Sequence, residues 1–431
     1  MLSMKIPRIE GEGEITLYID DNGIVNDVEY KIIESPRFFE YIIKGKHYTL
    51  IPDLLSRVCG YCGVSYILMS ALAFEKAGEF DVSETFEKYR EVIHLLERLK
   101  SHVIHICVMN LPDVLNISSI IELKRRNPLL FNQIVTLLNL VNNLTKLIMG
   151  RIHNTVNIRI GGVYKFPEPS VLLKAERILV NEFKPIFMNI AELILGSDNI
   201  PSHNQQLVYC ALKSSGYPHH GVDIECNDTE FNIHEFYEKK VTIEQKIGKT
   251  SLLYKLDGKG FVVGPLARFN KNYSTLIDET KEMLRRYGWL KKLSNTYQAV
   301  IARIAEVYDI IARITYEVPD LISNYPRLEQ PISHLEKPLN KDLCYYAVEA
   351  PRGILYGRFR VMRNGEITES NIITPTAQNI ASMEEIARRE LVGLKHDYAL
   401  KTAMKIAVSF DPCISCSVHK VYIKRSIHSY E

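Results

Sequence analysis

Arg57-Val-Cys59-Gly-Tyr-Cys62 and Asp411-Pro-Cys413-Ile-Ser-Cys416-Ser-Val-His419 are short stretches near opposite ends of a chain of 431 residues. Each contains a Cys-x-x-Cys pair, and four thiolates at such spacing can bind one soft metal centre. Zinc ribbons separate their two pairs by only about 15–20 residues, whereas 350 residues lie between Cys62 and Cys413. In a cytosolic chain, disulfides are a poor competitor to metal binding. We therefore predict that the two ends of the chain meet at one buried metal site.

β-structure is predicted close to both stretches. Residues 14–34 alternate apolar and polar side chains around Asp20-Asp21-Asn22-Gly23, which predicts a β-hairpin. Residues 344–375 are again β-rich, and Arg363-Asn364-Gly365 supplies a second hairpin turn. The range from about 200 to 270 contains short β-like runs broken by Gly and Pro, which indicates a loop-rich lobe. The candidate strands of this lobe are Val241-Thr-Ile, Ser251-Leu-Leu-Tyr and Phe261-Val-Val.

Long helices are predicted for the middle of the chain, from about Val64 onward. Apolar residues recur there at intervals of three and four, as in a core-facing helix: Val92, Leu95, Leu96, Leu99, Val103 and Ile106. Further helices are predicted at 117–149, 168–196, 275–317 and 376–408, and Asn116-Ile-Ser-Ser offers a cap for the first of them. The predicted fold class is α+β and predominantly α. It has a long-helix bundle core, with an N-terminal β-hairpin and a C-terminal β-rich segment that converge on the metal site.

The composition excludes several classes of protein. Hydrophobic residues make up 46% of the chain and charged residues 24%, as in folded globular proteins. The 53 basic and 51 acidic residues leave a net charge of +2, so no nucleic-acid partner is predicted. The most apolar stretch, 129–149, is interrupted by polar residues, so no transmembrane segment is predicted. The N-terminus has no signal-peptide pattern, and we expect a cytoplasmic protein.

Taken together, the two cysteine motifs resemble those of the large subunit of nickel-iron hydrogenases. In that family a Cys-x-x-Cys pair near each end holds a nickel-iron centre, and the C-terminal motif ends in histidine. Within that family, the chain most resembles the cytosolic, cofactor-coupled (non-uptake) hydrogenases. The interior segments that match, in the family's order, are Pro7-Arg8-Ile9-Glu10-Gly11, Gly150-Arg151-Ile-His153, Gly161-Gly162-Val163, Gly264-Pro265-Leu266-Ala267-Arg268, Glu349-Ala350-Pro351-Arg352-Gly353 and Thr374-Pro375-Thr376-Ala377-Gln378-Asn379.

The resemblance implies reversible heterolytic cleavage of dihydrogen to protons and electrons. Cys59 and Cys413 would be terminal nickel ligands, while Cys62 and Cys416 would bridge nickel and iron. The family's iron also carries carbonyl and cyanide ligands, which no side chain supplies and separate maturation proteins install.

The resemblance also implies roles for residues around the metals. Arg352 would lie above the open metal position, held by Asp411. A terminal thiolate, for which we select Cys413, would accept the first proton, and Glu10 would carry it onward. Glu40 and His419 match positions that bind a second ion, expected to be magnesium. Without the resemblance, an ion-paired or surface Arg352, a capping Asp411 and a solvated Glu10 are the alternatives.

The chain departs from the family at two places. Tyr66 stands where most members have a histidine, so a phenol would replace an imidazole beside the sulfur atoms. Glu12 stands where a histidine often follows the opening motif. His102 and His105 lie on a helical face opposite the apolar stripe, and either a role near the metal or an ordinary structural role is open for them.

The family's organisation implies further partners and a processed tail. Residues 1–419 would form the large-subunit domain, and residues 420–431 a maturation propeptide removed by a specific endopeptidase with the help of chaperones; an ordinary disordered tail is the alternative. The remaining cysteines, Cys107, Cys210, Cys226 and Cys344, lack iron-sulfur spacing. Electrons would therefore pass to an iron-sulfur small subunit, within an assembly that includes a flavin, ferredoxin or disulfide-reductase module.

Two other functions compete with this interpretation. A paralogue without hydrogen activity, such as a quinone- or sulfur-linked subunit, would keep the fold but lose nickel ligands. A zinc-stabilised scaffold would use the same cysteines without redox chemistry. The four retained cysteines argue against the first, and the 350-residue separation of the pairs argues against the second.

Overall fold

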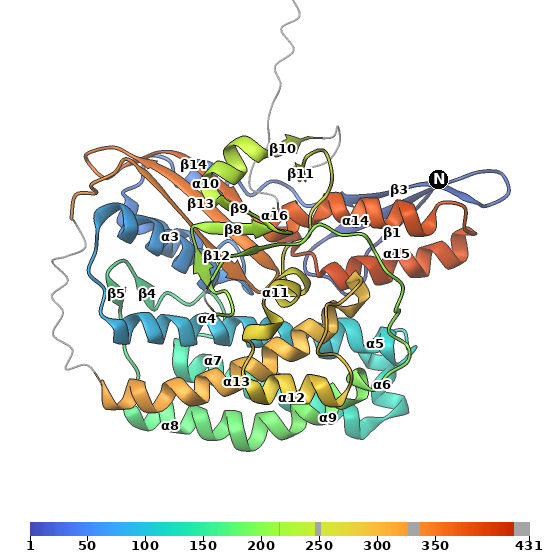
Figure 1. Cartoon of the computed structure of the whole chain (residues 1–431), viewed down its shortest axis with the longest axis horizontal. Coiled ribbons are helices and arrows are strands. Elements are labelled where there is room, and N and C mark those ends of the chain that lie inside the picture. The colour runs from blue at the N-terminus through green and yellow to red at the C-terminus, as the bar shows by residue number, and fades with distance from the viewer. Residues whose placement is uncertain (215, 246–250, 326–336, 418–431) are drawn as a thin grey trace, which may run out of the picture.

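The computed structural model describes residues 1–214, 216–245, 251–325 and 337–417. A layer of long helices forms one half of the molecule, and the sheets and shorter helices form the other (Figure 1). The predicted α+β class, predominantly α, is confirmed. The main helices of the long layer are α4 (Glu84–Ile104), α7 (Pro128–Met149), α8 (Pro169–Arg177), α9 (Lys184–Leu195) and α13 (Ala299–Ser323).

The predicted apolar stripe of α4 faces this core. Val92, Leu99 and Val103 are each at most 1% exposed, and α4 packs against α7 and α13. Helix α3 (Gly63–Gly78) precedes α4 and packs on the main sheet. The apolar stripe therefore packs α4 into the helical layer, next to α3 and the first cysteine pair.

Three of the predicted long helices are in fact interrupted. The range 117–149 contains α6 (Ile120–Arg126), capped by Ser119 as expected, and α7, because Pro128 restricts the residue before it and begins a new helix. The range 275–317 contains α12 (Asp278–Arg286) and α13, separated by a turn at Gly288. The range 376–408 contains α14 (Pro375–Leu391) and α15 (His396–Phe410), separated by a turn at Gly393. By contrast, 168–196 is continuous, since a π-helical segment, η3 (Ile178–Phe183), joins α8 to α9.

Both predicted hairpins are confirmed. Strands β2 (Gly13–Ile19) and β3 (Val25–Ile32) pair antiparallel, with β1 (Leu2–Lys5) on the far edge of β2. The inward side chains of this hairpin form a core with α14 and α15. The second hairpin forms the main sheet, in the order β14-β13-β12-β7. Its strands are β12 (Leu343–Ala350), β13 (Gly353–Val361), β14 (Ile367–Ile373) and β7 (His220–Gly221).

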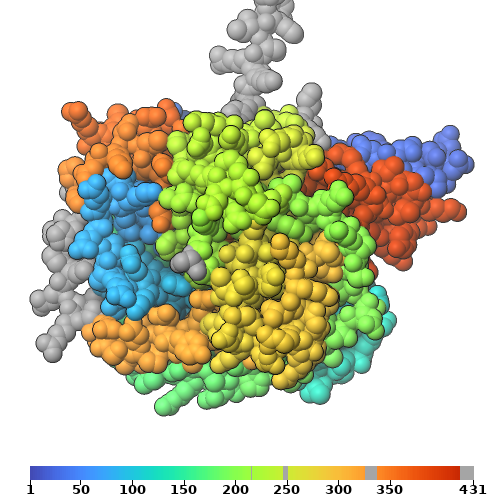
Figure 2. Space-filling view, in the orientation of Figure 1, coloured from blue at the N-terminus to red at the C-terminus, as the bar shows by residue number. Residues whose placement is uncertain are grey.

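The described residues between about 200 and 270, for which we predict a loop-rich lobe, form much of the face seen in Figure 2. This range contains β6 (Cys210–Leu212), β8 (Asp223–Cys226), β9 (Thr229–Asn232), β10 (Val241–Glu244), β11 (Leu253–Leu256) and the start of α11 (Pro265–Asn272). The candidate strand Phe261-Val-Val is wrong as a strand, and only Val262 forms an isolated bridge, to Tyr209. Through β7 the lobe joins the main sheet.

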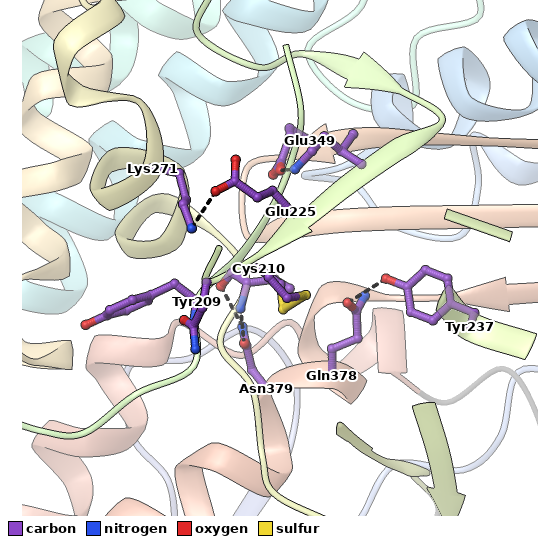
Figure 3. The surroundings of a disulfide bond; sticks show 12 residues. Tyr209, Cys210, Glu225, Tyr237, Lys271, Glu349, Gln378 and Asn379 are labelled. Carbon is purple, nitrogen blue, oxygen red and sulfur yellow. Dashed lines mark hydrogen bonds and ion pairs between the residues drawn. A yellow bond between two sulfur atoms is a disulfide. The ribbon is translucent and has the colours of Figure 1, made fainter. Parts of the chain in front are cut away.

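Cys210 and Cys226 lie directly opposite each other on β6 and β8 and form a disulfide bond. The bond lies in the lobe close to the end of the main sheet (Figure 3). Both cysteines are buried. This covalent link was not among the sequence-based expectations.

The remaining short elements complete the connections: α1 (Phe39–Ile42), α2 (Ile51–Leu55), α5 (Leu111–Val114), β4 (Ile158–Arg159), β5 (Gly162–Val163), α10 (Ile233–Glu235) and α16 (Ile414–Ser417). None of the helices among the described residues is both long and apolar enough to cross a membrane.

Candidate metal centre

The four predicted ligands meet at one point. One sulfur atom from each of Cys59, Cys62, Cys413 and Cys416 lies within 4.8 Å of the other three. The Sγ atoms of Cys59 and Cys413 are 3.5 Å apart, and those of Cys413 and Cys416 are 2.8 Å apart. All four side chains are at most 4% exposed. The ends of the chain therefore converge as predicted, in a site closed to bulk water.

The chemistry of these four donors suits a cation. Burial raises the pKa of the Cys413 and Cys416 thiols, while hydrogen bonding from Cys413 lowers the pKa of Cys59. The four adjacent buried sulfurs therefore compete for protons, because they cannot all carry a negative charge at once. A coordinated soft metal resolves this conflict, because coordination keeps thiolates deprotonated and neutralises their charge. The residues present therefore fit a soft transition-metal site.

The first cysteine pair is held by the start of α3. Cys62 is the residue before this helix, and the carboxyl group of Glu97 on α4 accepts hydrogen bonds from Val64 N (2.6 Å) and Ser65 N (3.0 Å). These are amides that the first turn of a helix leaves unpaired. Glu97 thereby fixes the direction in which Cys62 enters α3.

The second pair is held by contacts from two distant segments and by the end of helix α15. Cys413 forms a parallel β-bridge with Glu10, and Ile414 N donates to Glu10 O (3.0 Å). The hydroxyl of Thr376, at the start of α14, accepts from Cys413 N (2.8 Å). Helix α15 ends at Asp411 in the left-handed conformation (φ 52°), which turns the chain sharply into the cysteine motif.

Arg352 extends from the tight turn between β12 and β13 to the cluster. Its Nε donates to Asp411 O (2.9 Å) and its Nη2 to Asp411 Oδ1 (3.0 Å). Its Nη1 donates to Ser101 Oγ (3.3 Å) and lies 3.8 Å from Cys62 Sγ. The guanidinium is 4% exposed, so it is an ion-paired group of the site and not a surface arginine.

A buried polar chain continues from Asp411 into the helical layer. Arg303 lies 3.2 Å from Asp411 Oδ2 and donates to Nδ1 of His102 (3.0 Å). Because Nδ1 accepts, Nε2 of His102 carries the proton and donates to Glu306. Burial lowers the pKa of His102 to about 3, so this histidine is neutral. Asp411 therefore caps α15 through its backbone and pairs two arginines through its side chain.

The other predicted site residues lie at different distances from the cluster. The Glu10 carboxylate accepts from Ser415 N (3.1 Å), between the two C-terminal cysteines. The Glu40 carboxylate accepts from Ile372 N (2.7 Å) on β14. His419 and the tail 420–431 lie outside the described residues. Glu10 is thus beside the cysteine motif, whereas Glu40 lies against the main sheet.

The structure also places the residues that depart from the family pattern and the two histidines whose role was open. Tyr66 is 1% exposed on α3, and burial followed by the charges of the cysteines raises its pKa. Glu12 is exposed and pairs with Lys5 (3.3 Å), away from the cluster. His105 bonds Val408 O (2.8 Å). His105 thus bonds the last turn of α15, and His102 connects to Asp411 through Arg303.

Several residues of the site were not singled out from sequence: Glu97, Ser101, Arg303 and Glu306. Glu97 and Arg303 could have been found from the sequence, because each is a charged residue at a core-facing helical position. Such residues are rarely buried unless they are paired.

Comparisons with known proteins agree with this geometry. A family model described as nickel-dependent hydrogenase matches residues 37–165 and 234–419, and one described as HoxL-like matches residues 5–35. Sulfhydrogenase 2 subunit alpha of Pyrococcus furiosus is 32% identical over 421 residues, covering 96% of this chain and 97% of that protein. NAD-reducing hydrogenase HoxS subunit beta of Cupriavidus necator is 26% identical over 466 residues, covering 96% and 93%.

The fold has a counterpart among solved structures. An NAD+-reducing [NiFe]-hydrogenase in the H2-reduced state matches with a TM-score of 0.83 and 22% identity, covering 97% of this chain and 99% of that one. The likeness of fold therefore covers nearly the whole chain. The chain therefore belongs to the nickel-dependent hydrogenase family, as a large subunit and an oxidoreductase acting on hydrogen, whose four-cysteine cluster is the site for nickel and iron.

Proposed function

We propose that this chain catalyses the reversible heterolytic cleavage of dihydrogen at the four-cysteine cluster. The observation that carries the proposal is the placement of Arg352, whose guanidinium lies 3.8 Å from Cys62 Sγ in a buried site. A surface arginine would be screened by water and would act only weakly on the cluster. A fixed positive charge beside the reacting atoms is, by contrast, what charge separation in dihydrogen requires.

Cys59 and Cys413 would be terminal ligands of nickel, and Cys62 and Cys416 would bridge it to iron bearing carbonyl and cyanide. When bound, nickel and iron supply a Lewis-acidic pair that polarises dihydrogen. The convergence of all four sulfur atoms within 4.8 Å supports one shared site for both metals. The chain's own contribution is to keep the cysteines close together and away from water.

Arg352 and Asp411 act together in this proposal. Arg352 presents a permanent charge at the cluster, and its two hydrogen bonds to Asp411 fix the plane of the guanidinium. Asp411 in turn is held by Arg303 at 3.2 Å. This arrangement supplies positive charge without side-chain reorganisation during the reaction.

Protons leave by way of Cys413 and Glu10. The Cys413 sulfur accepts a proton, and Glu10 is the next carrier, because it lies in a β-bridge with Cys413 and its carboxylate reaches Ser415 N. Glu10 is only partly buried. It therefore connects the closed cluster with the more exposed side of the N-terminal segment.

A second cation, magnesium, would bind Glu40 and His419. A carboxylate oxygen is a suitable ligand for this hard ion, and Glu40 follows Arg37, which donates to Val58 O just before the first cysteine pair. Removal of residues 420–431 by a maturation endopeptidase, assisted by chaperones, would complete this end of the protein.

An iron-sulfur small subunit would take up the electrons. Gly60 is exposed although Cys59 and Cys62 on either side of it are buried, so the loop between these cysteines brings the cluster close to the surface. Phe38 and Tyr41, 52% and 77% exposed, lie on the segment that Arg37 ties to this loop through Val58 O. Contiguous exposed apolar surface marks protein interfaces, and we infer that the small subunit covers this segment. A flavin, ferredoxin or disulfide-reductase module would complete a cytoplasmic assembly.

The test is the metal content and infrared spectrum of the complex, purified without oxygen from a host that has the maturation proteins. We expect stoichiometric nickel and iron, carbonyl and cyanide stretching bands, and hydrogen-dependent reduction of an artificial acceptor. Cys413→Ser removes a cluster ligand and should abolish all three signals. Cys107→Ser is the matched control, because Cys107 is an equally buried thiol outside the cluster. Zinc, or no metal, in the mature wild-type complex would refute the proposal.

A further inference from the structure

The segment Gly264–Arg268 lies directly against the turn that carries Arg352. Gly264 has a φ of +106°, and a Cβ atom added to it would lie 2.4 Å from Arg352 O. Gly353 approaches from the other side, where an added Cβ atom would lie 2.7 Å from Gly264 N. The two backbones are therefore in close contact here, and the position of one determines the position of the other.

Arg268, at the end of this segment, binds the backbone just before Arg352. Its Nη1 donates to Ala350 O (2.9 Å) and its Nη2 to Pro351 O (3.1 Å). Arg268 is 0% exposed. These two carbonyl groups belong to the residues that immediately precede Arg352, so Arg268 holds the turn from which the Arg352 side chain extends.

Two carboxylates keep the Arg268 guanidinium in a single orientation. Nε and Nη2 donate to the two oxygens of Glu306 (2.8 and 2.9 Å), and Nη1 donates to Glu349 Oε2 (2.9 Å). Glu349 is itself fixed by Leu212 N (2.9 Å), two residues from the disulfide shown in Figure 3. Together with the two carbonyl groups, all five N–H donors of Arg268 are used. A lysine, with three donors and no fork, cannot reproduce this set.

Val263, the residue just before the segment Gly264–Arg268, is also held in place. Asn379, at the N-terminal part of α14, accepts from Val263 N (2.9 Å) and donates to Val263 O (3.2 Å). Asn379 lies beside this segment in Figure 3. The start of the segment is thus anchored to α14, and its end to Glu306 and Glu349.

We propose that Arg268 is a positioning residue, which holds the Ala350–Pro351 backbone so that the Arg352 guanidinium reaches Asp411 and Cys62. This inference rests on the proposed function of Arg352 for its catalytic consequence. Arg268 does not touch the cluster, so its effect on turnover passes through Arg352.

The test compares Arg268→Lys with Arg90→Lys in the metal-loaded complex. Arg90 is a matched control, because it is also buried, binds both oxygens of Glu75 and donates to the carbonyl of Gly162. Glu75 lies 12 residues beyond Gly63 on α3, which is about 18 Å along the helix from the cluster. A general loss of stability would affect both variants alike.

We expect Arg268→Lys to lower kcat per bound nickel roughly 10- to 100-fold, since a displacement of about 1 Å at a reacting group has effects of that size. Arg90→Lys should change it by no more than about twofold. When Arg352→Lys is already present, Arg268→Lys should lower kcat per bound nickel by no more than about a further twofold. The reason is that Arg268 acts through Arg352, which has already been replaced. An equal loss in both backgrounds would overturn the proposal.

Crystal structures of the complex provide a readout that needs no activity. In Arg268→Lys the Arg352 guanidinium should leave its position beside Cys62 and Asp411, and in Arg90→Lys it should stay. If Arg268→Lys does not assemble, Gly264→Ala displaces the same backbone without removing a charge and should also move Arg352. An unmoved Arg352 in these variants refutes the positioning role. A metal-loaded wild type without hydrogen turnover refutes instead the proposed function, and the crystal structures still decide the positioning role.

Discussion

Glu97 provides the sharpest prediction, because it is a carboxyl group 6% exposed that holds the start of α3. It accepts hydrogen bonds from two backbone amides and from the hydroxyl of Ser65. Burial outweighs these bonds and raises the pKa of Glu97 to about 8. We therefore predict that this carboxyl group is protonated at neutral pH in the metal-free chain.

The sign and size of the effect follow from linkage. The ordinary pKa of the group is 4.5, and the folded value is about 8. Between these values the folded chain binds more protons than the unfolded chain, so the free energy of unfolding falls as pH rises. The slope is about 1.4 kcal/mol per pH unit, which amounts to about 5 kcal/mol over the whole window. Below pH 4.5 the stabilisation is fully present.

The assay is urea unfolding of the metal-free chain at several pH values between 4 and 9, for the wild type and Glu97→Gln. Glutamine cannot ionise, so the wild type should lose stability relative to Glu97→Gln as pH rises through the window. Glu84→Gln, an exposed change on the same helix, controls for the altered net charge. A constant difference between wild type and Glu97→Gln across the window would refute the claim that burial outweighs the three hydrogen bonds.

Three further changes test other contacts, each by urea unfolding. Asp411→Asn leaves two buried arginines without a carboxylate and should cost about 3–5 kcal/mol; a loss below 1 kcal/mol would contradict the ion pairing. Thr376→Val removes the acceptor of Cys413 N and should lower the free energy of unfolding by about 1–3 kcal/mol. Thr376→Ser keeps the hydroxyl group and should retain most of the wild-type stability. Replacing both Cys210 and Cys226 by serine should cost about 3 kcal/mol. In the denatured wild type these two cysteines should resist alkylation until a reductant is added, and free thiols before reduction would disprove the disulfide.

Local features of the sequence were sufficient to predict the two hairpins. The turns at Asp20–Gly23 and Arg363–Gly365 combine residues that tolerate left-handed backbone with alternating strands on both sides, and both hairpins formed as expected. Helix ends were less accurately predicted. The apolar pattern continues through Asn127-Pro128, where the pattern alone indicated one helix, but proline restricts the residue before it and begins another.

The clustering of the four cysteines was predictable for a different reason, since thiolates at a short spacing have few other uses in such a chain. The contacts that hold the ligands were not predictable in the same way. Thr376 and Glu97 reach the cysteine motifs from segments that lie far away in sequence. The disulfide required the register of β6 and β8, because only that pairing places Cys210 opposite Cys226. Such contacts depend on the assembled tertiary structure, which no local pattern contains.

The bridge between Glu10 and Cys413 has a consequence for the order of events during synthesis. At about 5–20 residues per second, a ribosome needs roughly 20–70 s to add the 350 residues between Cys62 and Cys413. Throughout that interval the first cysteine pair exists without the second pair and without the C-terminal strand of the bridge. A metal captured then would meet two thiols in place of four, and a cell that makes this protein must withhold the metals, or shield Cys59 and Cys62, until the last residues have left the ribosome.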